Sequence, residues 1–151
     1  MRQIVISVGN FGEIEEVAAV EIENGQLTGK IFEASLHYEQ DKFCFANILD
    51  SLFMFISNAE LIVDEKNFHF DFHAQQYGLT EDCLRDHCHS MQYINDLFRP
   101  HFRHDGWGRR TNATGLCHHF NLSSIRKVYG DSALSDAMIM GVSYLIMTGT
   151  R

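Results

Sequence analysis

Residues 17–35 read VAAVEIENGQLTGKIFEAS and contain the turn that decides the fold. Asn24 and Gly25 separate two runs of strand-forming residues, and both residue types tolerate the positive φ angles that a tight hairpin turn requires. We therefore predict an antiparallel hairpin whose two strands cover residues 13–23 and 26–35.

The segments around this hairpin predict a sheet covered by helices. Residues 2–8 (RQIVISV) are apolar and β-branched, which is typical of a buried central strand. Apolar residues recur every three or four positions over 43–57, which indicates an amphipathic helix, and residues 60–63 (ELIV) return to a strand. We expect a mixed sheet in an α/β fold, with a long loop over 99–114 and further helices over 67–77, 91–98, 116–120 and 132–147. Pro100 should end the helix over 91–98, and Gly149 should cap the helix over 132–147.

Length and composition indicate a single globular domain, residues 1–151. Hydrophobic residues make up 45% of the chain and aromatic residues 12%, which excludes a disordered or low-complexity protein. No apolar run is long enough to cross a membrane, and no signal-peptide pattern is present, so we expect a cytoplasmic protein. In that compartment the four cysteines should be reduced thiols.

The net charge of −8 argues against a purely electrostatic nucleic-acid binder, but the charge is unevenly distributed. Residues 85–127 hold seven Lys or Arg and only three Asp or Glu, together with six of the nine His. Within this stretch one run combines cations with the single Trp, a composition that can contact phosphates and stack on bases, or anchor a protein partner. The alternative is a solvated loop whose Trp folds back on the domain. The binding residues expected from this run are Arg99, Arg103, Trp107, Arg109 and Arg110.

Four blocks of sequence carry a resemblance to a known family. They are RQIV at 2–5, AVEIENGQLTG at 19–29, AELIV at 59–63 and YLIMTG at 144–149. In this order they resemble the exonuclease domain of DNA polymerase III epsilon subunits, in the DnaQ-like, DEDDh branch of the ribonuclease H-like fold. The resemblance runs nearly end to end, and it implies that fold for this chain.

The resemblance also implies a chemistry, 3′-to-5′ hydrolysis of phosphodiesters by two Mg²⁺ or Mn²⁺ ions held by carboxylates, with a His as general base. Ser7 and Gly9 stand where the family has its Asp-x-Glu pair, and His69 stands where it has an Asp. Asp131 replaces the family's His, and Asp136 alone matches. Four of the five family positions are therefore changed. We expect no catalytic residue, no bound metal and no cofactor, in a domain kept as an accessory module that binds single-stranded DNA or RNA or a replication protein.

Two other functions stay open. A purely structural interaction module is one. The other is an active exonuclease with substitute metal ligands, drawn from Asp64, Asp71, Asp131 and Asp136 with His69, and still using Mg²⁺ or Mn²⁺. Asp64 ends a strand near the centre and is the better substitute, whereas Asp71 lies two residues from His69 and would point away from it on a helix. Asp131 is equally explained as an N-cap or first-turn anion of the last helix. Asp136 would accept a hydrogen bond from Ser7 or pair with His69.

A second group of side chains has the residue types of a zinc site, but its spacing fits no standard module. We expect no zinc here: the cysteines should pack in the ordinary way and the histidines should lie on the surface. The residues concerned are Cys83, His87, Cys88, His89, Cys117, His118 and His119. The sequence stops two residues after Gly149, where epsilon proteins continue into a tail that contacts the sliding clamp and the polymerase. We therefore expect neither of those contacts, and no membrane contact.

Overall fold

The computed structural model describes residues 1–11, 14–37, 42–64, 80–101 and 113–149. Across these ranges the strands form one five-stranded sheet in the order β3-β2-β1-β4-β5. β1 pairs antiparallel with β2 and parallel with β4, so the sheet is mixed. The strands are β1 (Gln3–Phe11), β2 (Ile14–Glu23), β3 (Gln26–His37), β4 (Glu60–Val63) and β5 (Ser90–Tyr93).

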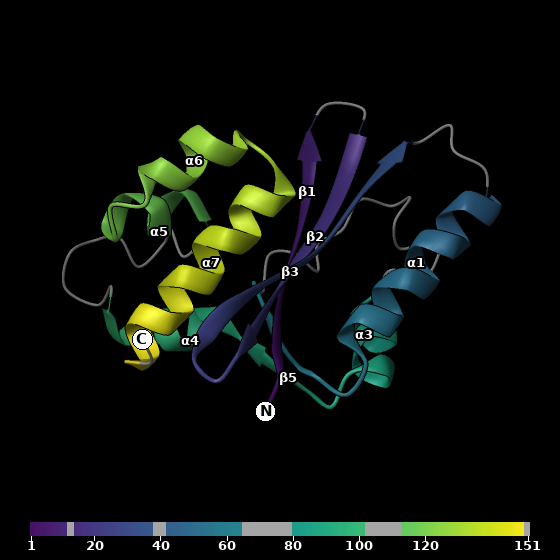
Figure 1. Cartoon of the computed structure of the whole chain (residues 1–151), viewed down its shortest axis with the longest axis horizontal. Coiled ribbons are helices and arrows are strands. Elements are labelled where there is room, and N and C mark those ends of the chain that lie inside the picture. The colour runs from purple at the N-terminus through teal and green to yellow at the C-terminus, as the bar shows by residue number, and fades with distance from the viewer. Residues whose placement is uncertain (12–13, 38–41, 65–79, 102–112, 150–151) are drawn as a thin grey trace.

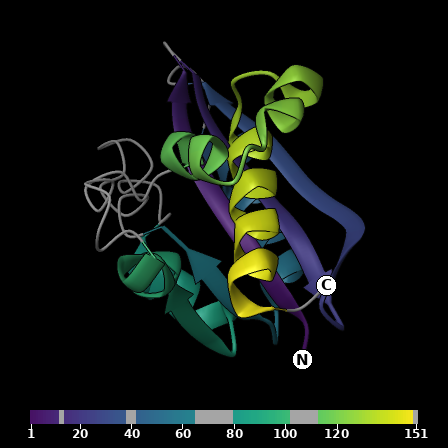
Figure 2. The same cartoon turned by 90° about the vertical axis from the view of Figure 1, so that its left-hand side faces the viewer.

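Helices cover both faces of this sheet (Figures 1 and 2). One face carries α1 (Lys42–Ile56) and α3 (Glu81–His87), and the other carries α7 (Ala133–Thr148) with the shorter helices around it. Those shorter helices are α4 (Ile94–His101), α5 (Ala113–His119) and α6 (Ser123–Tyr129). No helix in the described ranges is long and apolar enough to span a membrane.

Each face of the sheet has its own buried core, because side chains alternate along a strand. On β1, Ile4 and Ile6 pack toward α1, while Val5 packs toward α7. Ser7 and Gly9 have the same parity as Val5, so they belong to the α7 face. Asp64 shares the parity of Ile62, which lies in the α7 core.

The predicted hairpin, first helix, fourth strand and last helix are confirmed. Asn24 and Gly25 take φ values of 54° and 73° in the turn between β2 and β3. The hydroxyl oxygen of Ser132 accepts a hydrogen bond from the Ser135 amide at the start of α7, and Gly149 ends that helix in the left-handed conformation. The α/β architecture of a ribonuclease H-like domain is thus present.

Other predicted boundaries were wrong. Residues 91–93 belong to strand β5, which pairs parallel with β4, and the helix begins only at Ile94. Pro100 lies inside α4 rather than beyond its end, because a proline near the last turn removes a single helical hydrogen bond. Residues 99–101 and 113–114 are helical, so both ends of the predicted loop over 99–114 were wrong, and its middle lies outside the described residues. We did not predict α3 or α6, and the predicted helix over 67–77 lies outside the described residues.

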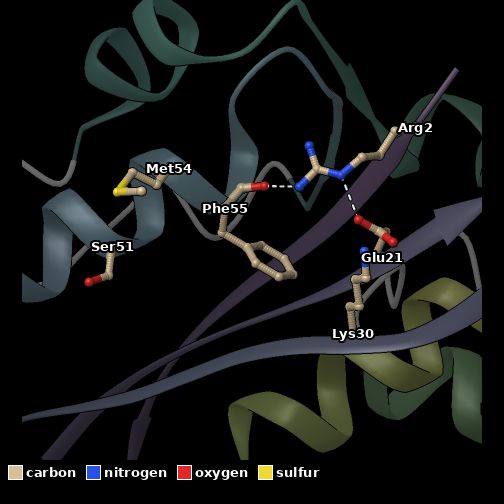
Figure 3. A pocket seen from close by; sticks show the side chains of 6 residues that line it. All are labelled: Arg2, Glu21, Lys30, Ser51, Met54 and Phe55. Atoms are coloured by element: carbon tan, nitrogen blue, oxygen red, sulfur yellow. Dashed lines mark hydrogen bonds and ion pairs between the residues drawn. The ribbon is translucent and has the colours of Figure 1, made fainter.

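The start of β1 is fastened to the end of α1 by one guanidinium (Figure 3). Nε of Arg2 lies 2.5 Å from Oε2 of the buried Glu21, and the guanidinium also donates to the carbonyl oxygens of Phe55 and Ser57. These carbonyls are among the acceptors that a helix leaves unsatisfied at its C-terminus. A surface hollow of about 520 Å³ lies beside this contact, between α1 and the β2–β3 hairpin.

Candidate functional site

The family positions meet where the ends of β1 and β4 face the first turn of α7. Ser7 and Asp64 are buried, with 2% and 5% of their surface exposed. Ser7 lies within β1 and Asp64 directly follows β4; the parallel register pairs Ile6 with Val63, so Ser7 and Asp64 stand at neighbouring positions one residue further on. On β1, Ser7 and Gly9 carry no carboxylate. The carboxylate near this point comes from Asp64, at the end of β4.

Asp136 has a positively charged partner that we did not predict. Its Oδ1 lies 2.6 Å from Nη1 of Arg126, which comes from α6. The same Nη1 donates to the hydroxyl oxygen of Ser135 at 2.9 Å. The side chains of Arg126 and Asp136 are only 21% and 24% exposed. This ion pair is therefore partly shielded from water, and it joins α6 to the first turn of α7.

The pKa of Asp136 lies above its ordinary value of 3.8. Burial is the main cause, because it disfavours the charged form. The guanidinium of Arg126 works in the opposite direction, while the negative charges of Asp131 and Asp64 add to the rise. The pKa of Asp136 is therefore set mainly by burial, which raises it, and by Arg126, which lowers it.

Asp131 does not act as the N-cap of α7, one of the roles considered for it. Ser132 is the N-cap, with a side-chain bond to the Ser135 amide of 3.1 Å. The side chain of Asp131 is 90% exposed, and its carboxylate lies 3.9 Å from Nε of Arg126. Ser132 occupies the extended backbone conformation of an N-cap, and its hydroxyl reaches the third helical amide, so Asp131 lies one residue before the cap.

Glu16 is a further residue of this site that the sequence did not reveal. It lies opposite Gly9 in the β1–β2 register, and its Oε1 accepts a hydrogen bond of 2.9 Å from the Ala133 amide. A carboxylate therefore reaches the N-terminus of α7 from β2. Nothing distinguishes Glu16 from the neighbouring glutamates in the sequence, and its role emerges only from the strand register.

Several predicted site residues lie outside the described part of the chain: His69, Asp71, Arg103, Trp107, Arg109 and Arg110. Arg99 belongs to α4, but its side chain is not among those described. The structure does describe the two flanking helices, α4, which ends at His101, and α5, which begins at Ala113. Both α4 and α5 contact α7, so these two helices lie on the α7 side of the sheet.

The histidines and cysteines have ordinary packing roles where they are described. His87 stacks on Phe53 with ring centroids 3.9 Å apart, and its Nδ1 lies 2.7 Å from the carbonyl oxygen of Cys83. Cys88 packs against the α1 core and Cys117 against the α7 core. His119 meets the ring of Phe120 edge-on.

The described residues do not fit the divalent-metal site that the resemblance implies. Ser7 and Gly9 supply no carboxylate, and the carboxylate of Asp136 is engaged by a guanidinium. Within the described ranges, no three His, Cys, Asp or Glu side chains are grouped so that they could hold a metal ion. Hard cations such as Mg²⁺ require several oxygen ligands, and these are not assembled here.

No family model matches the sequence. Comparison with curated proteins nevertheless finds relatives along nearly the whole chain. The DNA polymerase III subunit epsilon of Salmonella typhimurium is 29% identical over 181 residues, which covers 98% of this chain and 72% of that protein. The subunit from Escherichia coli is 27% identical over 98% of this chain and 72% of its own length. That of Buchnera aphidicola is 26% identical over 89% of this chain and 64% of its own.

These similarities agree in extent with the fold described above. A mixed sheet with a leading hairpin, a helix on one face and a long C-terminal helix on the other accounts for all four matching blocks. The chain is therefore similar to DNA polymerase III epsilon subunits along nearly its whole length, in agreement with the resemblance to a DnaQ-like exonuclease domain.

Proposed function

We propose that this domain is a non-catalytic epsilon relative that binds single-stranded nucleic acid. The observation that supports the loss of catalysis is the ion pair between Asp136 and Arg126, 2.6 Å long, at the one family carboxylate that is retained. Two-metal hydrolysis needs carboxylates that bridge and position two divalent cations. At this site a hydroxyl, a glycine and a neutralised aspartate stand in their places.

The binding function is supported by the position of the cationic stretch. Residues 102–112 include Arg103, Arg109, Arg110 and Trp107, and the helices at both ends of this stretch contact α7. The end of α4 and the start of α5 therefore lie on the same side of the sheet as Asp136. A stretch that combines arginine with an aromatic residue suits a single strand, because the cations contact phosphates and the ring stacks on bases. We place the protein in the cytoplasm, as the sequence predicts.

A nuclease assay tests the loss of catalysis. The pure protein is incubated with an end-labelled single strand and either Mg²⁺ or Mn²⁺, beside the Asp136→Ala variant. We expect no metal-dependent shortening, and wild type and variant should not differ. Shortening by the wild type that needs the metal and disappears in Asp136→Ala would establish the alternative function, an exonuclease with substitute ligands.

A salt titration of binding, followed by fluorescence anisotropy, tests the nucleic-acid partner. Each phosphate contact to a single strand contributes about 0.7 to the slope of log K against log salt, so Arg109→Ala with Arg110→Ala should lower the slope by about 1.4. The charge-matched control is Lys30→Ala with Arg85→Ala. Both control residues are exposed and lie on the α1 side, on β3 and α3, so this control should leave the slope unchanged.

The same titration separates the nucleic-acid partner from a protein partner. Phosphate contacts are strongest at low salt. If the wild type shows no binding there, the nucleic-acid function is wrong, and a replication protein becomes the partner to test. Equal losses in the two double variants would show that net charge matters, and not the stretch near α7, which would also contradict the proposal.

A further inference from the structure

We propose that α5 and α6 form a second part of the nucleic-acid surface, on which Lys127 contacts a phosphate and Tyr129 stacks on a base. This surface extends the cationic stretch of residues 102–112, so its role rests on the proposed binding function. Both helices belong to the described part of the chain, whereas most of the binding residues expected from the sequence lie outside it.

The segment that forms α5, the following turn and α6 contains no acidic side chain. In residues 113–130 there is no Asp or Glu, although the whole chain has 20 of them and a net charge of −8. The basic residues and histidines of this segment are Arg126, Lys127, His118 and His119. The first acidic residue after it, Asp131, lies 3.9 Å from Nε of Arg126. A polyanion therefore meets no repelling carboxylate from α5 or α6.

The outer side of α6 is open to solvent. None of its residues is buried, and Val128 and Tyr129 are 74% and 42% exposed. Lys127 is exposed as well, whereas Arg126 is partly buried. An aromatic ring close to a lysine is the combination that single-strand-binding surfaces use, because the ring stacks on a base while the ammonium group contacts the phosphate.

Polar contacts hold α6 against the domain, so these exposed side chains have a fixed position. Nη1 of Arg126 lies 2.6 Å from Oδ1 of Asp136, on the first turn of α7. The hydroxyl of Ser132 donates to the carbonyl oxygen of Tyr129 at 3.1 Å. Successive residues of a helix point about 100° apart, so Lys127 turns away from the ion pair that its neighbour Arg126 forms. It is thus the lysine, and not the arginine, that α6 offers to a ligand.

The surface is continuous along the chain with the stretch of residues 102–112. α5 begins at Ala113, directly after that stretch, and both α5 and α6 contact α7 (Figures 1 and 2). Each of the two helices has seven residues, which corresponds to a length of about 10 Å. A strand held at the start of α5 therefore has only the length of two short helices to cover before it reaches Lys127 and Tyr129.

The test measures binding of a fluorescein-labelled oligothymidine by anisotropy. Tyr129→Ala should weaken binding about tenfold, which is the usual contribution of stacking one base on an aromatic ring. Tyr129→Phe keeps the ring and should bind as the wild type does. Lys127→Ala should lower the slope of log K against log salt by about 0.7, because one phosphate contact is lost. The matched control is Lys30→Ala, an exposed lysine beside α1, which should leave the slope unchanged.

Photo-crosslinking locates the contact directly. A single strand that carries 5-iodouracil is irradiated with the wild-type protein, and the modified peptide is identified by mass spectrometry. We expect a crosslink at Tyr129 that disappears in Tyr129→Ala. Because Lys127 and Tyr129 are exposed, the unfolding midpoints of their variants should stay within about 2 °C of the wild type. Weaker binding then reflects a lost contact and not a lost fold.

Three outcomes would overturn the proposal. Wild-type affinity in Tyr129→Ala with a wild-type slope in Lys127→Ala would do so, even where Arg109→Ala with Arg110→Ala weakens binding and supports the proposed function. A loss that Tyr129→Phe shares would contradict stacking. The absence of any binding by the wild type at low salt would contradict the proposed function as well, and an acidic protein segment would become the partner to test on this surface.

Discussion

Glu16 lies directly opposite Gly9 across the β1–β2 pair, and its carboxylate accepts a hydrogen bond of 2.9 Å from the Ala133 amide. The residue that stands where the resemblance implies a metal-binding carboxylate has no side chain, while its cross-strand neighbour extends a carboxylate to the start of α7. A negative group is favourable there, because the N-terminus of a helix carries unsatisfied amides and a partial positive charge. The acidic residue on β2 thus serves the helix rather than a metal.

Replacing Glu16 by Ala should lower the free energy of unfolding by about 1 kcal/mol, which is the usual cost of removing a helix cap. Urea denaturation followed by circular dichroism measures this change. Glu33→Ala on β3 removes the same side chain from an exposed position and should have an effect within about 0.5 kcal/mol of zero. Equal effects of the two substitutions would show that the hydrogen bond to Ala133 contributes nothing.

Replacing Arg2 by Met should destabilise the fold by about 3 kcal/mol, because it leaves the buried carboxylate of Glu21 without its ion pair. Oε1 of Glu21 has no hydrogen-bond partner among the described residues, so the contact of Oε2 with Arg2 is the ion pair that this carboxylate would lose. The substitution also removes the hydrogen bonds that Arg2 donates to the carbonyl oxygens of Phe55 and Ser57. A double variant, Arg2→Met with Glu21→Gln, should recover part of the stability. No recovery would mean that the packing of the Arg2 stem, rather than its charge, is what matters.

The same pair predicts a dependence of stability on pH. Burial alone would raise the pKa of Glu21, but Arg2, Thr28 and Lys30 outweigh it and lower that pKa below the ordinary value of 4.5. A lowered pKa stabilises the folded state above pH 4.5, and this stabilisation is lost as the pH falls through the folded-state value. Urea denaturation between pH 3 and 6, an interval chosen to bracket that value, should therefore show a shallower pH dependence for Glu21→Gln than for the wild type. Superimposable profiles would contradict the assignment.

The titration of Asp136 should be visible by carbon-detected NMR. Its pKa is raised above 3.8, mainly by burial, and Arg126 limits the rise. Removing the guanidinium in Arg126→Met should therefore move the pKa further upward. A raised pKa favours the folded state at low pH, so the stability of this variant should fall as the pH rises through that range. Arg85→Met should leave the titration of Asp136 unchanged, and an equal shift in both variants would contradict this account.

Gly141 lies where α7 packs against β1, β2 and β3, facing Val5, Val20 and Leu27. A methyl group there would lie 3.4 Å from side-chain carbons of Leu27 and Val20, which is ordinary contact. Gly141→Ala should therefore be neutral or stabilising by up to about 1 kcal/mol, since alanine favours the helix. Gly141→Val should cost about 1–3 kcal/mol through overpacking. Urea denaturation of both variants checks the order, and a destabilising alanine would show that the helix cannot shift by even a few tenths of an ångström.

Much of the scaffold could be predicted from local sequence. The Asn24-Gly25 turn and the apolar alternation around it predicted the hairpin, and the helical period over 43–57 predicted α1. Ser132 and Gly149 are residue types that favour the two ends of a helix, and the last helix indeed lies between them. Turn chemistry, hydrophobic period and capping act between residues close in the chain, so they can be recognised without knowing the fold.

The elements that were wrong or missing are short. β5 has four residues, and α3 and α6 have seven each. Segments of this length are not stable alone and form because neighbouring elements complete them. β5, for example, extends the sheet by pairing with β4. Its residues 91–93 carry a pattern compatible with a helix, and only the partner strand decides otherwise.

By itself, the sequence determined an α/β fold of the DnaQ-like kind, and it has Ser7 and Gly9 on the first strand where the resemblance implies acidic residues. Only the tertiary structure decided what surrounds the retained Asp136. Arg126 is ten residues away on another helix and Glu16 is on another strand, and no local pattern links either of them to α7. Interactions between distant residues depend on strand register and helix packing, because these set which charges come within a few ångströms of one another.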